Sequence, residues 1–293
     1  PVVNRMPASW AAQQSQPWTD DASGVFDGFE ESKIRGTGRS TSGLASMIIV
    51  YSGKGGVGKT TTSVQLAEIA AEAGLRVILI DGNSGQGDLR TCLRLNQSDL
   101  PTIYDAAVGE PRTAVLTPDM INAERNQALG TVKFAFVSAP PEELEEDVVT
   151  NDVYKKVIAY ARRNADLVIL DTQIIEARDR TGVVDGLIIP ALVHDAWGVG
   201  VAEMSNVGVN NLNSRLRLLI SKGVPADRLM TLINKVPTEQ AEDAARAGAM
   251  MRSKSTYLGI GMFDDSIRND MNAGRVTVSP TLAGPLNAAL LRV

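Results

Sequence analysis

The chain alternates between short, continuous runs of apolar residues and longer stretches in which apolar residues recur at helical spacing. Continuous apolar runs of this length are typical of strands that are buried on both faces of a sheet. They predict strands at residues 47–51, 75–80, 133–137, 167–170, 186–193, 229–233 and 257–260.

Helical spacing of apolar residues separates these strands. The first such stretch begins after residue 59 and is ended by Gly74. The spacing recurs at residues 153–163, 199–221 and 239–251. Buried strands that alternate with helices indicate an α/β fold with a mostly parallel central sheet and helices on both faces. Ligands of such sheets bind at the carboxyl ends of the strands.

The first 45 residues differ from the rest. They are rich in Ser, Gly, Gln, Asp and Pro and show no sustained period, so we predict a flexible or docking tail at 1–45 and one domain at 46–293. The tail contains Trp10, Trp18, Phe26 and Phe29, which are either anchors on the body or on a neighbouring subunit, or incidental side chains. A second polar stretch, the acidic run at 142–147, is expected to begin a solvated helix.

A glycine-rich loop follows the first predicted strand. Gly53, Gly58, Lys59 and Thr60 fit the phosphate-binding pattern G-x-x-x-x-G-K-[ST], and the required strand and helix flank it. Backbone N–H groups of such a loop and the helix N-terminus attract phosphate oxygens, and the lysine reaches the terminal phosphates. The predicted binding residues are Gly53, Lys54, Gly55, Gly56, Val57, Gly58, Lys59, Thr60 and Thr61.

Two of the predicted strands end in aspartate. Asp171 closes the run at 167–170, which is the Walker B pattern, and Asp81 closes the run at 75–80. Carboxylates and a loop hydroxyl are suitable ligands for Mg²⁺, directly or through water. We therefore predict a magnesium site that uses Thr60, Asp81 and Asp171.

The loop carries an additional lysine, Lys54, directly after Gly53. A K-G-G-x-G-K-T loop resembles the deviant Walker A motif of the ParA/MinD family of P-loop ATPases. The resemblance implies ATP and Mg²⁺ as cofactors and an early lysine that reaches the nucleotide of a partner subunit. It implies the following residues for catalysis: Lys54, Lys59, Asp81, Asn83 and Asp171.

The resemblance extends over about residues 46–293. Asn234 matches the strand-end Asn that contacts adenine in this family, and Phe263 lies in a late segment that resembles the one beside the base. Two features depart from the pattern. Asn83 stands where the family usually has the second acid of a D-x-D segment. The residues at 173–176, Gln-Ile-Ile-Glu, replace the Pro or Gly of a flexible second switch.

Composition narrows the alternatives. With 293 residues, 44% hydrophobic residues and a net charge of −5, the chain suits an ordinary globular protein. One cysteine, Cys92, excludes an intrachain disulfide and a paired-cysteine cluster site, and it fits a cytoplasmic location. One histidine, His194, is expected near the end of a buried strand. No apolar run reaches the roughly 18 residues of a membrane helix.

The resemblance implies a ParA-like ATPase that binds Mg-ATP, assembles with itself as an ATP-sandwich homodimer or a higher assembly, and positions or partitions DNA or a protein complex. We expect slow hydrolysis, because Asn83 cannot act as a base. The alternatives are a scaffold or filament-forming protein with little ATPase activity and a MinD-like positioning protein. A small-molecule kinase would leave Lys54 unexplained.

The partners also follow from the resemblance. An adaptor protein is expected to activate hydrolysis. The C-terminal stretch at 285–293 has one basic residue, which does not suit a membrane-binding helix. Non-specific DNA binding and a merely solvated basic surface both stay open. The candidate basic residues are Arg215, Arg217, Lys222, Arg228, Arg246, Arg252, Lys254 and Arg275.

Overall fold

The computed structural model describes residues 43–83, 87–96, 98–140, 148–176, 179 and 181–293. The tail at 1–42, with its four aromatic residues, and the acidic run lie outside the described residues, as does part of the loop that follows Asn83. The boundary between tail and domain stays a prediction.

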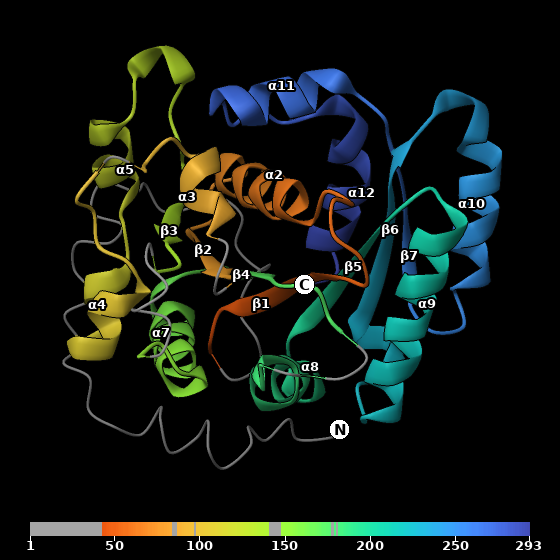
Figure 1. Ribbon diagram of the computed structural model, residues 1–293, viewed down its shortest axis with the longest axis horizontal. Helices are drawn as coiled ribbons and strands as arrows, with labels where there is room; N and C mark the ends of the chain where they lie inside the picture. Colours follow the sequence, from red (N-terminus) through yellow and green to blue (C-terminus); the bar gives the residue numbers. More distant parts are fainter. Residues whose placement is uncertain (1–42, 84–86, 97, 141–147, 177–178, 180) are drawn as a thin grey trace.

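The described residues form a seven-stranded parallel sheet (Figure 1). Its order is β3-β2-β4-β1-β5-β6-β7, so β1 lies in the middle. The predicted parallel α/β fold is confirmed. The strands are β1 (Ser46–Ser52), β2 (Val77–Gly82), β3 (Ala135–Val137), β4 (Leu167–Thr172), β5 (Trp197–Glu203), β6 (Leu229–Val236) and β7 (Thr256–Met262).

Two hydrophobic cores, one on each face of the sheet, hold the helices in place. One core takes side chains from α2 (Lys59–Glu72), α3 (Asp88–Cys92), α5 (Pro118–Glu124), α11 (Asp265–Ala273) and α12 (Pro280–Leu290). The other takes them from α4 (Ile103–Val108), α7 (Asn151–Asn164), α8 (Ile189–His194), α9 (Asn206–Ser221) and α10 (Ala241–Met250). Short turns connect these elements: η1 (Pro111–Ala114), η2 (Gln127–Leu129), η3 (Val184–Ile188), η4 (Ala226–Arg228) and η5 (Thr238–Gln240). Within the described parts of the chain, no helix has the length and apolar character needed to cross a membrane.

Two predicted elements are wrong. The run at 186–193 is not a strand but the end of the π-helical turn η3 followed by α8, and His194 ends that helix. A continuous apolar run fits a buried helix as well as a buried strand, so the pattern alone could not separate the two. The stretch at 199–221 is not one helix, because it begins as strand β5 and becomes α9 only after Ser205, whose side chain caps the helix.

Strand β5 was missed because it contains Gly198 and Gly200, which weaken a strand in sequence terms. The structure explains both glycines. A Cβ built at Gly200 would lie 2.7 Å from Leu212 Cδ1 and 3.0 Å from the hydroxyl oxygen of Tyr51, and one at Gly198 would lie 3.0 Å from the same ring. The fully buried Tyr51 side chain on β1 thus occupies the space that β5 side chains would need.

Candidate functional site

The glycine loop at 53–58 connects β1 to α2 at the carboxyl end of the central strand, as predicted. Gly56 and Gly58 have φ angles of +75° and +92°, which favour glycine. Helix α2 starts at Lys59 without a side-chain cap, so its first N–H groups are available to a ligand. A helix start of this kind is suited to an anion.

The end of β6 supports this loop from one side. The Asn234 amide donates a hydrogen bond to the Val57 carbonyl at 3.1 Å, and Lys235 Nζ donates to the Gly56 carbonyl at 2.6 Å. A Cβ built at Gly58 would lie 2.4 Å from Asn234 Nδ2, so a glycine is required for this close approach.

Asn234 and Phe263 were predicted to contact adenine. Asn234 is 5% exposed, and its side chain supports the loop through the hydrogen bond described above. Phe263 is 52% exposed, and its backbone N–H donates a hydrogen bond to the Val236 carbonyl. Neither residue is among those that line the cavity described below. Their contact with a base stays a prediction.

Asp171 is the hydrogen-bonding centre of the site. Its carboxylate accepts hydrogen bonds from Thr60 Oγ1 at 2.8 Å and from Ser63 Oγ at 2.9 Å. Lys59 Nζ lies 3.3 Å from the same carboxylate. The side chains of Lys59 and Asp171 are 11% and 2% exposed, so this ion pair is largely shielded from water. The structure therefore brings the predicted loop lysine, loop threonine and Walker B acid together.

Asp81 lies beside Asp171, because the two residues are register partners on β2 and β4. One oxygen of Asp81 accepts a hydrogen bond from the Asn83 N–H at 3.1 Å, and the other is buried without a hydrogen-bond partner in the described chain. Burial, and then the nearby Asp171 charge, raise the pKa of Asp81 well above its usual range.

These residues fit a divalent cation. A buried carboxylate oxygen without a partner, next to a second carboxylate and a threonine hydroxyl, is a set of hard oxygen ligands of the kind that Mg²⁺ prefers. A cation would also offset the repulsion between the two acids. The arrangement suits the predicted set of Thr60, Asp81 and Asp171, whose role as metal ligands stays a proposal.

A cavity of about 660 Å³ opens above the loop, which is the size range of small-molecule sites. One wall is the loop itself, with Lys59, Thr60 and Thr61. The opposite walls come from the two segments that follow the aspartates, since the cavity is also lined by Asn83, Asp88, Gln173, Ile174, Glu176, Asp179, Thr181 and Val184.

The segment after Asp171 is attached to the central strand. The Ile175 N–H donates to the Ser52 carbonyl at 2.9 Å, and the Ile175 side chain is fully buried. Gln173 Nε2 donates to Thr181 Oγ1 at 2.6 Å, which ties the two ends of the segment together. Ile174, 38% exposed, lies beside Gly55. The apolar residues that replace the usual Pro or Gly thus anchor this wall of the cavity.

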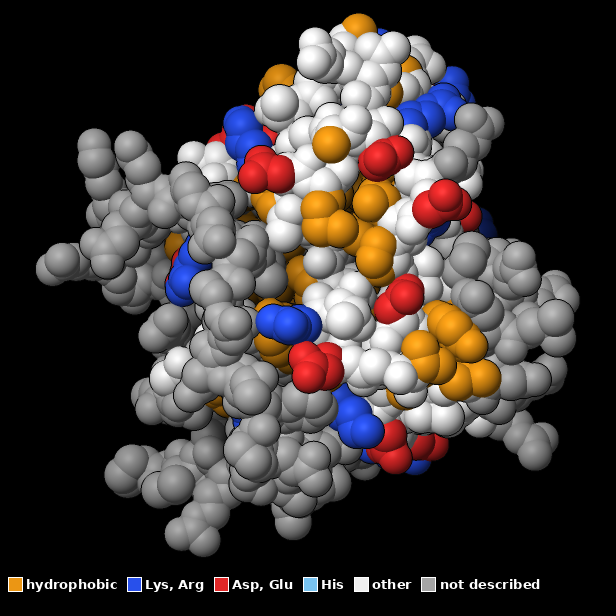
Figure 2. Space-filling view, turned by 90° about the vertical axis from the view of Figure 1, so that its left-hand side faces the viewer, with side chains coloured by type: hydrophobic (Ala, Val, Ile, Leu, Met, Phe, Trp, Pro, Cys, Tyr) orange, Lys and Arg blue, Asp and Glu red, His pale blue; other side chains and the backbone are white. Residues whose placement is uncertain are grey.

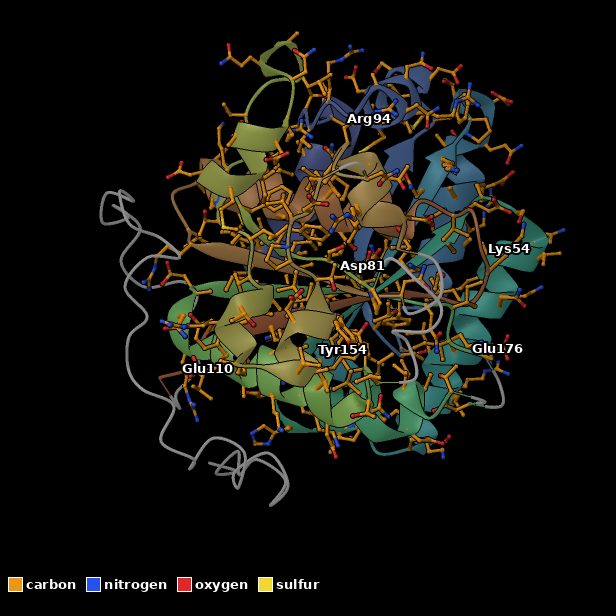
Figure 3. All side chains as sticks on the ribbon, turned by 60° about the vertical axis from the view of Figure 1, so that its left-hand side comes forward. Lys54, Asp81, Arg94, Glu110, Tyr154 and Glu176 are labelled. Atoms are coloured by element: carbon orange, nitrogen blue, oxygen red, sulfur yellow. The ribbon has the colours of Figure 1, made fainter. Side chains whose placement is uncertain are left out.

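Lys54 does not point at the aspartates. It forms an ion pair with Glu203 at the end of β5, and this contact lowers the pKa of Glu203. Ser205 Oγ donates to the same carboxylate at 3.2 Å. Figure 3 shows Asp81 near the middle of the molecule and Lys54 toward the side that carries α9. The additional lysine is therefore held at the margin of the site, with 41% of its side chain exposed.

Sequence analysis did not predict several residues of the site, among them Ser63, Lys235 and Glu203. Ser63 lies one turn after Thr60 on α2, and this helical spacing was a usable signal. Lys235 follows Asn234 and has a left-handed backbone, φ +54°, which no sequence pattern indicated. Glu203 was hidden because its strand was assigned to a helix.

Comparisons with known proteins agree with this geometry. The model of an AAA domain family matches residues 45–196, just over half of the chain. The septum site-determining protein MinD of Synechocystis is 40% identical over 102 residues, which cover 28% of this chain and 38% of that protein. The sporulation initiation inhibitor protein Soj of Bacillus subtilis is 30% identical over 130 residues, 44% of this chain and 49% of Soj.

Solved structures show the same fold. The structure of MinD from Pyrococcus horikoshii in complex with Mg-ADP has a TM-score of 0.64 and 17% sequence identity, and the alignment covers 83% of this chain and 94% of that one. The sequence matches to the first curated relatives span only about a quarter to under half of their length. The family model, these relatives and the deviant glycine loop agree: the chain belongs to the ParA/MinD family of P-loop ATPases.

Proposed function

We propose that this protein is an ATPase that binds Mg-ATP at the glycine loop and assembles with itself in an ATP-dependent way. The observation that carries the proposal is the cluster on Asp171, where a lysine and two hydroxyls meet one buried carboxylate beneath a glycine loop. A further unpartnered oxygen, on Asp81, lies alongside. The relatives and the Mg-ADP complex of MinD support the same assignment.

The residues would divide the work as follows. The loop N–H groups and Lys59 hold the phosphates, because both carry positive or partly positive charge. Thr60, Asp81 and Asp171 hold Mg²⁺, which when bound neutralises charge on the phosphate oxygens. For this, Lys59 exchanges its present partner, Asp171, for phosphate.

The position of Lys54 is the basis for proposing self-assembly. Its side chain is partly exposed at the margin of the cavity, and it is paired with Glu203 rather than with a residue that touches phosphate. A second subunit that brings its own nucleotide to this margin would offer Lys54 a more strongly charged partner. The ATP-sandwich homodimer, or a higher assembly built from it, follows from this exchange.

We propose that the assembly positions or partitions a cargo, either DNA or a protein complex, and that an adaptor protein activates hydrolysis. DNA binding remains a hypothesis. Among the candidate basic residues, Lys222, Arg246 and Arg275 form ion pairs with Asp185, Asp243 and Asp270, and Arg228 lies over the Trp197 ring. Co-sedimentation with DNA, with and without ATP and across salt, tests it, because phosphate contacts give a steep salt dependence.

A second candidate is a scaffold that assembles on ATP but hydrolyses it very slowly. It is favoured by Asn83, which lines the cavity where the family has an acid and which cannot accept a proton at neutral pH. Asp88 also lines the cavity and is the residue that would restore a carboxylate there.

The central test is Lys59→Ala. Loss of the ammonium that faces the phosphates should weaken ATP binding, measured by calorimetry, and phosphate release by at least about tenfold. Lys156→Ala on the exposed face of α7 is the matched control and should change neither. Equal ATP affinity and turnover in Lys59→Ala and the parent would refute nucleotide binding at this loop.

A further inference from the structure

Two successive carbonyls of the glycine loop are held by the end of β6. Lys235 Nζ donates a hydrogen bond to the Gly56 carbonyl at 2.6 Å. Asn234 Nδ2 donates one to the Val57 carbonyl at 3.1 Å. In a planar trans peptide, the C=O of one residue and the N–H of the next point in opposite directions. Fixing these two carbonyls toward β6 therefore turns the N–H groups of Val57 and Gly58 away from β6.

These N–H groups are available to a ligand. Neither Val57 nor Gly58 is a donor in the backbone hydrogen bonds of the loops and turns that the structure describes. Two other carbonyls of the loop are held as well: Ser52 Oγ donates to that of Lys54 at 2.9 Å, and Thr62 Oγ1 donates to that of Gly58 at 2.8 Å. N–H groups without acceptors, set opposite carbonyls that have donors, are the arrangement of an anion-binding nest.

The side chains of β6 reach the loop because this strand has a bulge at its end. Its register against β7 shifts between Ile233 and Val236. Two residues of β6, Asn234 and Lys235, therefore stand opposite Gly261 alone. An extra residue of this kind re-aims the side chains of a strand, and bulges are common next to functional sites.

The bulge holds Lys235 in a strained conformation. Its φ of +54° lies in the left-handed region, which side chains other than those of Gly, Asn and Asp rarely adopt. The neighbouring strands fix this part of β6 on both sides. The Met204 N–H donates to the Asn234 carbonyl at 3.3 Å, and the Phe263 N–H donates to the Val236 carbonyl at 2.8 Å. Backbone strain that the surroundings enforce is concentrated at functional sites.

The charge of Lys235 is directed at the loop backbone. Lys54 and Lys59 also line the cavity, but they pair with the carboxylates of Glu203 and Asp171. In the described part of the chain, no carboxylate lies within ion-pair distance of Lys235, whose hydrogen bond goes to a neutral carbonyl. Such a charge-assisted hydrogen bond is stronger than one between two neutral groups. The ammonium therefore stabilises the shape of the loop.

We propose that Asn234 and Lys235 are positioning residues, which pre-form the anion-binding loop by fixing two of its peptide groups before the nucleotide binds. This inference rests on the proposed function, and it assigns the end of β6 to the phosphate part of the ligand. For Asn234 this role differs from the adenine contact that the resemblance implies. Its side chain is 5% exposed, and an added Cβ at Gly261 would lie 2.7 Å from its Oδ1, so both ends of the amide are occupied by protein.

The test compares a ligand that has a base with one that has none. Lys235→Met keeps the length of the side chain and removes the donor. It should bind Mg-ATP and inorganic Mg-tripolyphosphate about three- to tenfold more weakly than the parent, and by the same factor, as measured by calorimetry. Lys235→Arg keeps a donor and should restore both affinities. Asn234→Ala should also weaken both; a loss confined to ATP would make Asn234 a base-contacting residue and overturn its positioning role.

The order of the loop without ligand separates positioning from direct contact. NMR relaxation of the Val57 and Gly58 amides gives order parameters, which are about 0.85 in rigid backbone and below about 0.6 in flexible backbone. In nucleotide-free Lys235→Met these values should fall, because the loop has lost one of its supports. A lysine that only attracts phosphate would leave them unchanged. Weaker binding with unchanged order parameters would therefore overturn the positioning role.

Lys235→Asn separates binding from folding. Asparagine tolerates the left-handed conformation, and its shorter side chain does not reach the Gly56 carbonyl. The midpoint of urea unfolding should therefore stay the same or rise, while both affinities fall as in Lys235→Met. Lower affinity that appears only together with a lower unfolding midpoint would make Lys235 a structural residue and overturn the inference.

Lys156→Met on α7 is the matched control, because it removes the same charge from an exposed position. Helix α7 lies on the left-hand side of the molecule in Figure 1, away from β6, and on that side basic side chains are scattered among acidic and apolar ones (Figure 2). This variant should change none of the measurements. If the parent binds neither ligand, the proposed function fails, and this inference fails with it. If the parent binds both and Lys235→Met binds them equally well, only the role of Lys235 is wrong.

Discussion

A buried acid on the phosphate-loop helix should make stability fall as pH rises. Glu68 on α2 is only 2% exposed, and one of its carboxylate oxygens has no hydrogen-bond partner in the described chain. The ammonium nitrogen of Lys133 lies 3.6 Å from the Glu68 carboxylate. Lys133 is closer to Glu72, whose carboxylate it contacts at 2.8 Å. Burial raises the pKa of Glu68 to about 7, from an ordinary value of 4.5.

The direction of this pH dependence follows from the protons that the folded and unfolded states bind. The folded state keeps a proton on Glu68 up to about pH 7, whereas the unfolded state releases it near pH 4.5, so the folded state is favoured most at low pH. This stabilisation is lost as pH rises from 4.5 through about 7. A shift of this size corresponds to about 3 kcal/mol in all, of which about 1.4 kcal/mol falls between pH 6 and 8.5.

Glu68→Gln isolates this effect, because the amide keeps the shape of the protonated acid and does not titrate. The free energy of unfolding is measured for both proteins by urea denaturation with circular dichroism, from pH 6, above the pI of about 5.1, to pH 8.5. The advantage of Glu68→Gln over the parent should grow by about 1.4 kcal/mol across this range, or about 3–6 °C in Tm. A difference between the two proteins that stays constant with pH would refute the reasoning.

Three further predictions concern the site. Lys54→Ala should bind ATP like the parent but should not assemble with a non-hydrolysable analogue, as measured by light scattering; normal assembly would remove the role of this lysine. Glu203→Gln should assemble about 1.4–5-fold more readily in the same assay, because a partly exposed ion pair of about 0.2–1 kcal/mol no longer holds Lys54, and an unchanged midpoint contradicts this. Asn83→Asp should raise steady-state phosphate release by up to about 10²-fold and shorten the lifetime of the assembly. If the parent already turns over at several per second, Asn83→Asp changes nothing and Asp88→Asn abolishes release, then Asp88 is the base and the scaffold hypothesis is wrong.

Much of the fold could be predicted because the buried strands of a parallel sheet leave continuous apolar runs. The errors occurred where a continuous apolar run is not a strand, or where a strand has no continuous apolar run. At 186–193 the run belongs to a helix buried in the core, which is as apolar as a strand. At β5 the apolar character is diluted by Gly198 and Gly200, and part of the reason for these glycines is a tyrosine about 150 positions earlier in the chain. Such contacts between distant residues leave no local period.

The site was predictable where chemistry needs fixed spacing, as for Lys59 and Thr60 in the loop, or a strand end, as for Asp171. The site residues that contact one another from neighbouring strands could not be predicted from the sequence. Glu203 meets Lys54 only because β5 lies beside β1 in the sheet order, and Lys235 reaches the loop from the end of β6. The attachment of Ile175 to the Ser52 carbonyl likewise depends on the neighbouring strands rather than on any motif.

The packing of Tyr51 against two glycines has a consequence for how this sequence can vary. Positions 51, 198 and 200 share one volume, so their permitted side chains depend on one another. An alanine at Gly200 is incompatible with the tyrosine ring and with Leu212, and it becomes admissible only where a small aliphatic group replaces the ring and leaves room for the end of the Leu212 side chain to move. In homologues, a smaller residue at the position of Tyr51 should therefore occur together with a larger residue at position 198 or 200. Either substitution should destabilise this protein when it is introduced alone.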